Sequence, residues 1–108
     1  MTISKRARQM VSSVDSRKLR NNTQRVLVAL LRAEGDWIPR SNVRVANATS
    51  RMRELRRPEY GGFDVQVATA AELGRPGGSR RTYYRLNPRT VTAERIASVL
   101  QTAITPER

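Results

Sequence analysis

The sequence predicts a single α+β domain made of several helices and one β-hairpin. Apolar residues recur at the helical spacing of three and four positions before residue 57 and again after residue 91. Between these regions, two segments alternate apolar and polar residues, and a glycine-rich stretch separates them, which is typical of a hairpin. A chain of 108 residues is long enough for one modest hydrophobic core but not for two.

The charge of the chain indicates a polyanionic partner. It has 21 basic residues against 9 acidic ones, which gives a net charge of +12 at pH 7. Most of the basic residues are arginine, whose planar guanidinium suits bidentate contacts with phosphate and guanine, although a GC-rich coding genome produces the same bias. A surplus of this size favours nucleic acid as the partner.

The residue types that are absent exclude several kinds of chemistry. The sequence has no cysteine and no histidine, which rules out disulfides, zinc fingers, thiol nucleophiles and imidazole catalysis. Its acidic residues are scattered and form no D-x-D or E-x-x-D cluster for a metal ion. A nuclease or recombinase would have to use Tyr60 or Tyr84 without these groups. We therefore expect a protein that is not an enzyme and that needs no metal, cofactor or small-molecule ligand.

The N-terminal region, residues 1–21, is predicted to form either a short amphipathic helix or a basic arm that becomes ordered when it binds phosphates. An apolar stripe at helical spacing runs through Ile3, Ala7, Met10, Val11 and Val14. The region lacks the pattern of a signal peptide, and no apolar run in the chain approaches the roughly 18 residues of a membrane span. We expect a soluble cytoplasmic protein, in the cytoplasm or nucleoid of a bacterium or in a phage-infected host.

The next helix is predicted to begin at Asn21 or Asn22, because asparagine is a favourable N-cap. Gly35 provides its C-terminal stop. Its buried face is predicted to consist of Val26, Leu27, Leu30 and Leu31. Trp37 and Ile38 then precede Pro39 in a short extended segment, since a residue before proline avoids the helical region. We expect Trp37 to plug the core or a hinge rather than to stack on a base.

An arginine-rich helix is predicted over residues 47–57. Asn47 is expected to cap it with its side-chain oxygen, and Pro58 forbids its continuation. A helical arrangement places Ala48, Met52 and Leu55 on one side. The other side carries hydroxyls and guanidinium groups, which suit the major groove, although a solvated basic face has the same pattern. A brief helix from Arg40 or Ser41 to Val45, with Val43 and Ala46 toward the core, would complete a helix-turn-helix pair.

Two strands and a final helix are predicted to follow. Residues 63–67 and 82–86 alternate apolar and polar positions, and the intervening glycines and proline predict a long basic tip. Thr92 is expected to cap the last helix, with Val91 and Ile96 forming a hydrophobic staple. The apolar set of this helix is wider than one packing seam needs, and it consists of Ala93, Ile96, Ala97, Val99, Leu100, Ala103 and Ile104.

This order of elements resembles the winged helix-turn-helix fold. The segments that carry the resemblance are Asn47-Ala-Thr-Ser-Arg-Met-Arg-Glu-Leu-Arg-Arg57, Phe63-Asp-Val and Tyr83-Tyr-Arg-Leu86, which look like small helix-turn-helix proteins of bacteriophages and actinobacteria. The resemblance implies a winged-helix core over residues 22–88, with an additional N-terminal helix or arm in 1–21 and a C-terminal helix in 89–108. In that family the second helix of the pair enters the major groove, and the wing lies on the phosphate backbone or in the minor groove.

Carried onto this sequence, the resemblance implies three sets of residues for double-stranded DNA. The residues for bases are Thr49, Ser50, Arg53 and Arg57. The residues of the wing are Arg75, Arg80 and Arg81. The residues for phosphates flank the recognition face and are Arg40, Arg44, Arg51 and Arg56. The charge of the chain agrees with this placement, since residues 40–57 hold six arginines and one acid, and residues 75–89 hold five arginines and none.

The function that these observations favour is sequence-specific binding of double-stranded DNA by a small regulator of transcription, or of a phage or mobile element. The alternative is a docking module for structured RNA or a protein, or an accessory factor in recombination or replication. We expect a homodimer, because helix-turn-helix proteins read two half-sites by two-fold symmetry. The residues expected at its interface are Ile96, Val99, Leu100, Ala103 and Ile104. The alternative is that both terminal helices pack on their own core.

Overall fold

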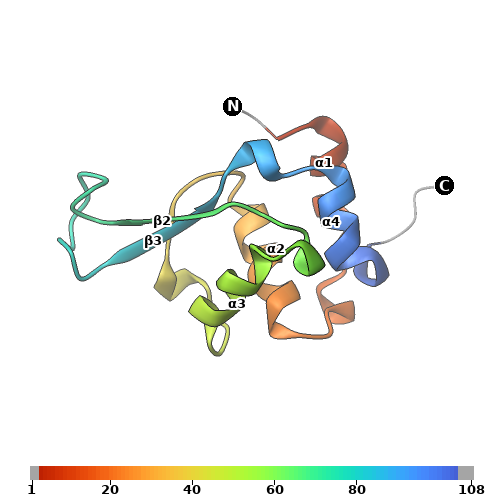
Figure 1. Ribbon diagram of the computed structural model, residues 1–108, viewed down its shortest axis with the longest axis horizontal. Coiled ribbons are helices and arrows are strands. Elements are labelled where there is room, and N and C mark those ends of the chain that lie inside the picture. Colours follow the sequence, from red (N-terminus) through yellow and green to blue (C-terminus); the bar gives the residue numbers. More distant parts are fainter. Residues whose placement is uncertain (1–2, 105–108) are drawn as a thin grey trace.

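The computed structural model of the chain describes residues 3–104, without the side chain of Thr102. The described part contains four α-helices and a three-stranded antiparallel sheet (Figure 1). In chain order these are α1 (Lys5–Ser12), α2 (Asn22–Arg32), β1 (Ile38–Pro39), α3 (Ala48–Leu55), β2 (Val65–Thr69), β3 (Thr82–Leu86) and α4 (Ala93–Leu100). The predicted α+β class is confirmed. Within residues 3–104, none of the helices has the length and apolar character needed to cross a bilayer.

Helix α2 lies at the centre of the core. Asn21 caps it, since its Oδ1 accepts a hydrogen bond of 2.9 Å from the backbone N–H of Gln24. The helix ends at Arg32, and the chain then turns through Glu34 and Gly35, which both have positive φ. The buried face of α2 includes the four predicted residues Val26, Leu27, Leu30 and Leu31. Both the predicted cap and the predicted core face of this helix are confirmed.

The sheet has the strand order β1-β3-β2, so β3 lies between its two neighbours. The predicted bounds of β3 are confirmed, whereas β2 begins two residues later than predicted. The reason is that Phe63 belongs to the helical body, where its side chain is buried and its backbone N–H donates to the carbonyl of Leu55. The β2–β3 hairpin extends away from the helices, on the left of Figure 1. Its tip is held by backbone hydrogen bonds from Ala70 N–H to the Arg81 carbonyl and from Ala71 N–H to the Gly78 carbonyl.

The terminal segments pack together and complete the core. Helix α1 is formed as predicted, with Ala7 fully buried, and it packs against α4 (Figure 1). Val14 pairs with Ile104 in an isolated antiparallel bridge, and the backbone N–H of Asp15 donates to the Ala103 carbonyl at 2.8 Å. The terminal helices therefore enlarge the core of their own chain.

This packing buries, within the chain itself, three of the residues that we expected at a dimer interface. Ile96, Leu100 and Ala103 have no exposed surface, because α4 buries them against the other helices. Val99 and Ile104 are partly buried against the same core. The apolar residues of α4 pack within the chain, because α4 contacts α1 and its buried residues belong to the central core. Thr92 caps α4 and Val91 and Ile96 are both buried, as the predicted staple requires.

The segment before α3 departs from the predicted helix pair. The helix expected from Arg40 or Ser41 to Val45 is a single 3-10 turn, Arg40–Asn42. Proline precedes this turn, and the β-branched Val43 and Val45 follow it. A longer helix here would still have fewer than two turns and would consist of residues of poor helical propensity, so it is not stable. Val43 is buried as predicted, but Ala46 is exposed.

Asn47 also has a different role from the predicted one. Its φ is +56°, in the left-handed region, and its side chain makes no capping hydrogen bond to α3. Asparagine is one of the few residues with a Cβ that adopts this conformation at small cost. Asn47 therefore provides the sharp turn into α3, at a backbone conformation that is most often occupied by glycine. The helix itself ends at Leu55, so that Arg57 lies beyond it in an extended conformation.

Candidate nucleic-acid interface

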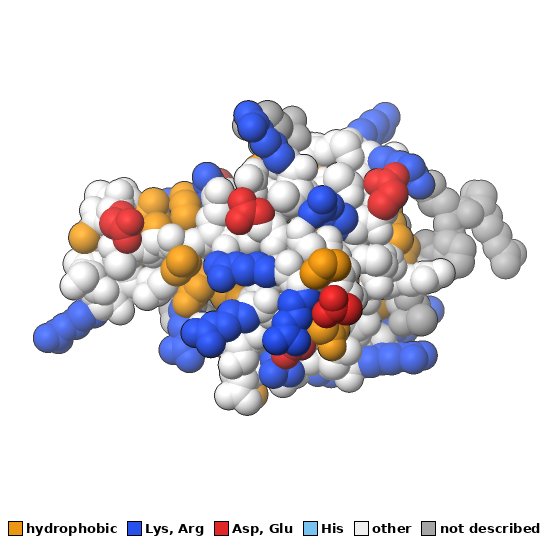
Figure 2. Space-filling view, in the orientation of Figure 1, with side chains coloured by type: hydrophobic (Ala, Val, Ile, Leu, Met, Phe, Trp, Pro, Cys, Tyr) orange, Lys and Arg blue, Asp and Glu red, His pale blue; other side chains and the backbone are white. Residues whose placement is uncertain are grey.

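Helix α3 has one buried side and one exposed side. Ala48, Met52 and Leu55 are buried, as predicted. Ser50 and Arg53 are exposed and lie three positions apart, which places them on one side of the helix. Thr49 is only half-exposed, because it lies in a groove between α3 and β2. In Figure 2, lysine and arginine side chains gather over the part of the surface that α3 forms in Figure 1.

Two of the four arginines predicted to contact phosphates are engaged within the chain. Arg51 Nη2 lies 2.7 Å from Glu54 Oε1, and Glu54 Oε2 accepts a hydrogen bond from the Thr23 hydroxyl at 3.1 Å. Arg56 Nη2 donates to the Val65 carbonyl at 2.6 Å. Arg51 thus links α3 to α2, and Arg56 links the end of α3 to β2. These contacts hold the helix in place and leave less of either guanidinium for a ligand.

The other two predicted phosphate residues, Arg40 and Arg44, are exposed. Arg40 lines a shallow hollow of about 380 Å³ between the 3-10 turn and the tip of the β2–β3 hairpin. The hollow is lined by Pro39, Arg40, Ser41, Gly77, Arg80, Arg81 and Thr82. It brings together two of the three predicted wing arginines, a predicted phosphate residue and two hydroxyl groups. Such a set of donors fits the oxygens of a phosphate group.

A second groove lies between α3 and β2 and has a volume of about 250 Å³. Its lining includes Thr49, Arg53 and Val67. The side chain of Val67 is 52% exposed, which is unusual for a valine in a strand. Among the described residues, it is the large hydrophobic side chain that is exposed to solvent. An apolar side chain therefore lies in the same groove as the guanidinium of Arg53.

Arg75, the third predicted wing residue, lies elsewhere. Its guanidinium lies over the ring of Tyr83, 4.9 Å from Cζ to the centroid, and Nη1 donates to the Trp37 carbonyl at 3.3 Å. Arg85 lies over the indole of Trp37 in the same way, at 4.6 Å. Trp37, which we expected to plug the core or a hinge, is half-buried beneath Arg85 and is not part of the core cluster. The alternation of Tyr83 and Arg85 along β3 is the signal of this arrangement in the sequence, since residues two apart on a strand share one face.

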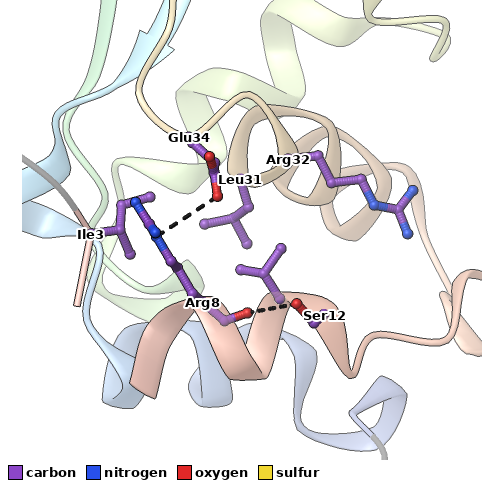
Figure 3. A pocket seen from close by; sticks show the side chains of 7 residues that line it. Ile3, Arg8, Ser12, Leu31, Arg32 and Glu34 are labelled. Carbon is purple, nitrogen blue, oxygen red and sulfur yellow. Dashed lines mark hydrogen bonds and ion pairs between the residues drawn. The ribbon is translucent and has the colours of Figure 1, made fainter. Parts of the chain in front are cut away.

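A further hollow of about 370 Å³ lies between α1 and α2 (Figure 3). Ile3, Val11 and Leu31 provide apolar walls, and Arg8 Nε lies 3.7 Å from Glu34 Oε1 across it. The charge of Arg8 is thus partly compensated by Glu34. This hollow is separate from α3 and from the wing, and it adds nothing to the basic surface.

In comparisons with protein-family models, curated proteins and solved structures, nothing matches this chain. The interpretation of the basic surface therefore depends on the residues and their geometry alone.

Proposed function

We propose that this protein binds double-stranded DNA in a sequence-specific manner, with α3 in the major groove and the β2–β3 hairpin on the phosphate backbone. The observation that carries the proposal is the exposed side of α3, where Ser50 and Arg53 point away from the buried Ala48 and Met52. The major groove admits an α-helix, and a guanidinium there donates to O6 and N7 of guanine. The four ion pairs of the described residues do not involve Arg53, so its charge is not compensated in this way.

The wing supports the same proposal through a different kind of contact. Arg80 and Arg81 lie with Arg40 around the hollow beside the tip of the hairpin. A DNA backbone that passes this hollow would place phosphate oxygens within reach of three guanidinium groups. Contacts of this kind fix the position of the protein on the duplex and carry no sequence information themselves. In this arrangement Arg53 and Ser50 provide specificity, and the wing provides affinity.

The groove between α3 and β2 adds an apolar element to the base-reading surface. The exposed Val67 lies beside Arg53. An aliphatic side chain in the major groove contacts the C5-methyl group of thymine, which distinguishes that base from cytosine. We propose that a guanine contact by Arg53 and a thymine contact by Val67 are parts of one recognition surface. A small regulator of transcription, or of a phage or mobile element, would use a surface of this kind.

The experiment that tests the proposal is selection of bound fragments from a random duplex library, followed by sequencing. We expect a short motif to be enriched, and we expect Arg53→Ala to abolish its enrichment while total recovered DNA changes little. Arg89→Ala is a matched control, because Arg89 is an exposed arginine outside α3 and the wing. Recovery of random sequence by the wild-type protein would refute specific binding. A motif with two-fold symmetry would indicate that two copies bind together.

A further inference from the structure

The outer face of the sheet carries a second group of basic and aromatic side chains. Successive residues of a strand point to opposite faces, and Tyr84 and Leu86 belong to the core. Tyr83 and Arg85 therefore point to the other face of β3. Their cross-strand partners on β2 are Ala68 and Gln66, which share that face. This outer face is turned away from the core side of the sheet.

On this face, two aromatic rings alternate with three guanidinium groups. Arg85 lies over Trp37, while Arg75 and Arg81 lie over Tyr83 at 4.9 and 5.7 Å from its centroid. Two of the arginines are held by additional hydrogen bonds, from Arg85 Nε to Gln66 Oε1 at 2.6 Å and from Arg75 Nη1 to the Trp37 carbonyl. We call this surface the stacked arginine face and define it as Trp37, Arg75, Arg81, Tyr83 and Arg85.

The charge of the stacked arginine face is not balanced within the described part of the chain. The ion pairs found in residues 3–104 involve Arg6, Arg8, Arg17 and Arg51, and none of the three arginines on this face. Like charges on neighbouring side chains repel one another. If these side chains only supported the structure of the hairpin, neutral side chains could cover Tyr83 without this repulsion. A purely structural role therefore does not require three guanidinium groups. A bound polyanion would remove the repulsion.

The flat groups on this face suit unpaired bases. Bases of single-stranded nucleic acid stack on aromatic rings and on guanidinium planes, whereas the bases of a duplex are already stacked on each other. The rings of Trp37 and Tyr83, together with the hydrogen bonds of Arg75 and Arg85, hold these guanidinium groups in place before any ligand arrives. Arg81 also lines the hollow that contains Arg40 and Arg80, so a site for phosphate borders the stacking surface directly.

We infer that the stacked arginine face is a binding site for single-stranded nucleic acid, separate from the α3 surface. Bases stack on the guanidinium planes of Arg75 and Arg85, and the phosphates of the same strand run toward the hollow at Arg81. The inference does not depend on base reading by α3, because none of the five residues lies on that helix, although Arg81 also lines the hollow that we propose for duplex phosphates.

Fluorescence of Trp37 provides a direct test, since the chain has one tryptophan. The full-length protein is titrated with a short oligothymidine, with an oligouridine of the same length, and with a duplex of the same length that lacks any selected motif. We expect both single strands to quench the emission of Trp37 and to bind more tightly than this duplex. Comparison of the two single strands shows whether the site prefers DNA or RNA. Absence of binding by both would overturn the inference.

A charge-preserving variant separates stacking from general attraction. Arg75→Lys combined with Arg85→Lys keeps both charges but removes the planar groups, and we expect it to weaken single-strand binding about tenfold. The control is Arg53→Ala, which should leave single-strand binding unchanged. The stacked arginine face is not the site if the double lysine variant binds single strands as tightly as the wild type does. The same conclusion follows if Arg53→Ala weakens the binding of single strands and the lysine variant does not. Circular dichroism verifies the fold, and the single variant Arg85→Lys replaces the double variant if the latter unfolds.

Discussion

Arg51 and Glu54 form an ion pair of 2.7 Å on α3, one helical turn apart. The same carboxylate accepts a hydrogen bond from Thr23 on α2, so the pair joins two helices. Arg51 is thus part of the structural support of α3, although its place in an arginine-rich segment suggested a phosphate contact. The Nε atom of Arg51 is buried without a hydrogen-bond partner among the described residues, which indicates how closely the side chain is packed.

The first prediction follows from this pair. Arg51→Ala should lower the free energy of unfolding by about 1 kcal/mol, because it leaves a partly buried carboxylate with one partner fewer. Urea denaturation measures the change. Arg44→Ala is the matched control, since Arg44 is exposed, and should change stability by less than about 0.5 kcal/mol. A large loss of duplex affinity in Arg51→Ala at unchanged stability would restore Arg51 as a phosphate contact.

The second prediction distinguishes Arg53 from Arg57. Arg53→Ala should weaken binding to the selected duplex motif by about 1 to 3 kcal/mol and hardly affect random duplex, because a base contact is lost. Arg57 lies beyond the end of α3, so Arg57→Ala should weaken both duplexes to a similar extent. Fluorescence anisotropy with the two duplexes measures both variants. Equal losses on both duplexes for Arg53→Ala would show that α3 does not read bases.

The third prediction concerns the hollow beside the tip of the β2–β3 hairpin. Replacement of Arg80 and Arg81 by alanine should reduce affinity for every duplex and make the slope of log affinity against log salt shallower, by roughly one unit for each lost phosphate contact. The expected cause is a smaller release of counterions. Arg89→Ala serves again as the control with an unchanged slope. If the slope of the double variant equals that of the wild type, the wing does not touch the backbone.

The fourth prediction concerns stability at Ile96, a residue of α4 that we expected at a dimer interface and that is buried within the chain. Ile96→Asp should unfold the protein at room temperature, because a buried carboxylate without a partner costs several kcal/mol, a large part of the stability of a typical domain. Circular dichroism and sedimentation measure folding and mass together. Ser98→Asp, on the exposed side of the same helix, should remain folded. A folded Ile96→Asp monomer obtained from a wild-type dimer would instead support an interface at this position.

The fifth prediction is a pH dependence in the wing. The carboxylate of Glu72 accepts hydrogen bonds from the backbone N–H and the hydroxyl of Thr69, both at 3.0 Å, and these bonds lower the pKa of Glu72, the backbone bond most of all. Their stabilising contribution is complete above the ordinary glutamate pKa and is lost as the pH falls through the lowered pKa of the folded state.

An NMR titration of the Glu72 carboxyl tests this relation. We expect a midpoint below that of the same residue in an unfolded peptide, and Thr69→Val should move the midpoint partway back because it removes the hydroxyl alone. The backbone N–H remains in that variant. A midpoint equal to the peptide value in the wild-type protein would show that the two hydrogen bonds do not persist in solution.

Local sequence signals predicted the elements that depend on local chemistry. Asn21 and Thr92 cap their helices as expected, and strand β3 has the predicted bounds, since capping and alternation act over a few residues. The inner side of α3 followed equally well from its helical spacing. Whether its outer side contacts DNA is a separate question, which the second prediction addresses.

Several errors occurred where distant parts of the chain decide the outcome. The sequence does not show that α1 returns to cover Ile96 and Leu100, so these residues looked like surplus apolar residues. Trp37 was expected in the core or a hinge because its stacking partner, Arg85, is far away along the chain. The hydrogen bonds from Thr23 to Glu54 and from Arg56 to the Val65 carbonyl likewise depend on the tertiary fold around α3, whereas the Arg51–Glu54 pair has the spacing of neighbours on a helix and could have been predicted.

The contact between the two ends of the described chain has a consequence for the order of folding. Asp15 donates to Ala103, and Val14 pairs with Ile104, so these bonds close a loop that encloses almost all of the described residues. Closing so long a loop is entropically unfavourable until the intervening residues are already compact. We therefore expect the α2, α3 and hairpin region to form the nucleus and the terminal helices to join after the transition state. Substitutions at Ala7 or Ala103 should then accelerate unfolding while leaving the rate of folding nearly unchanged.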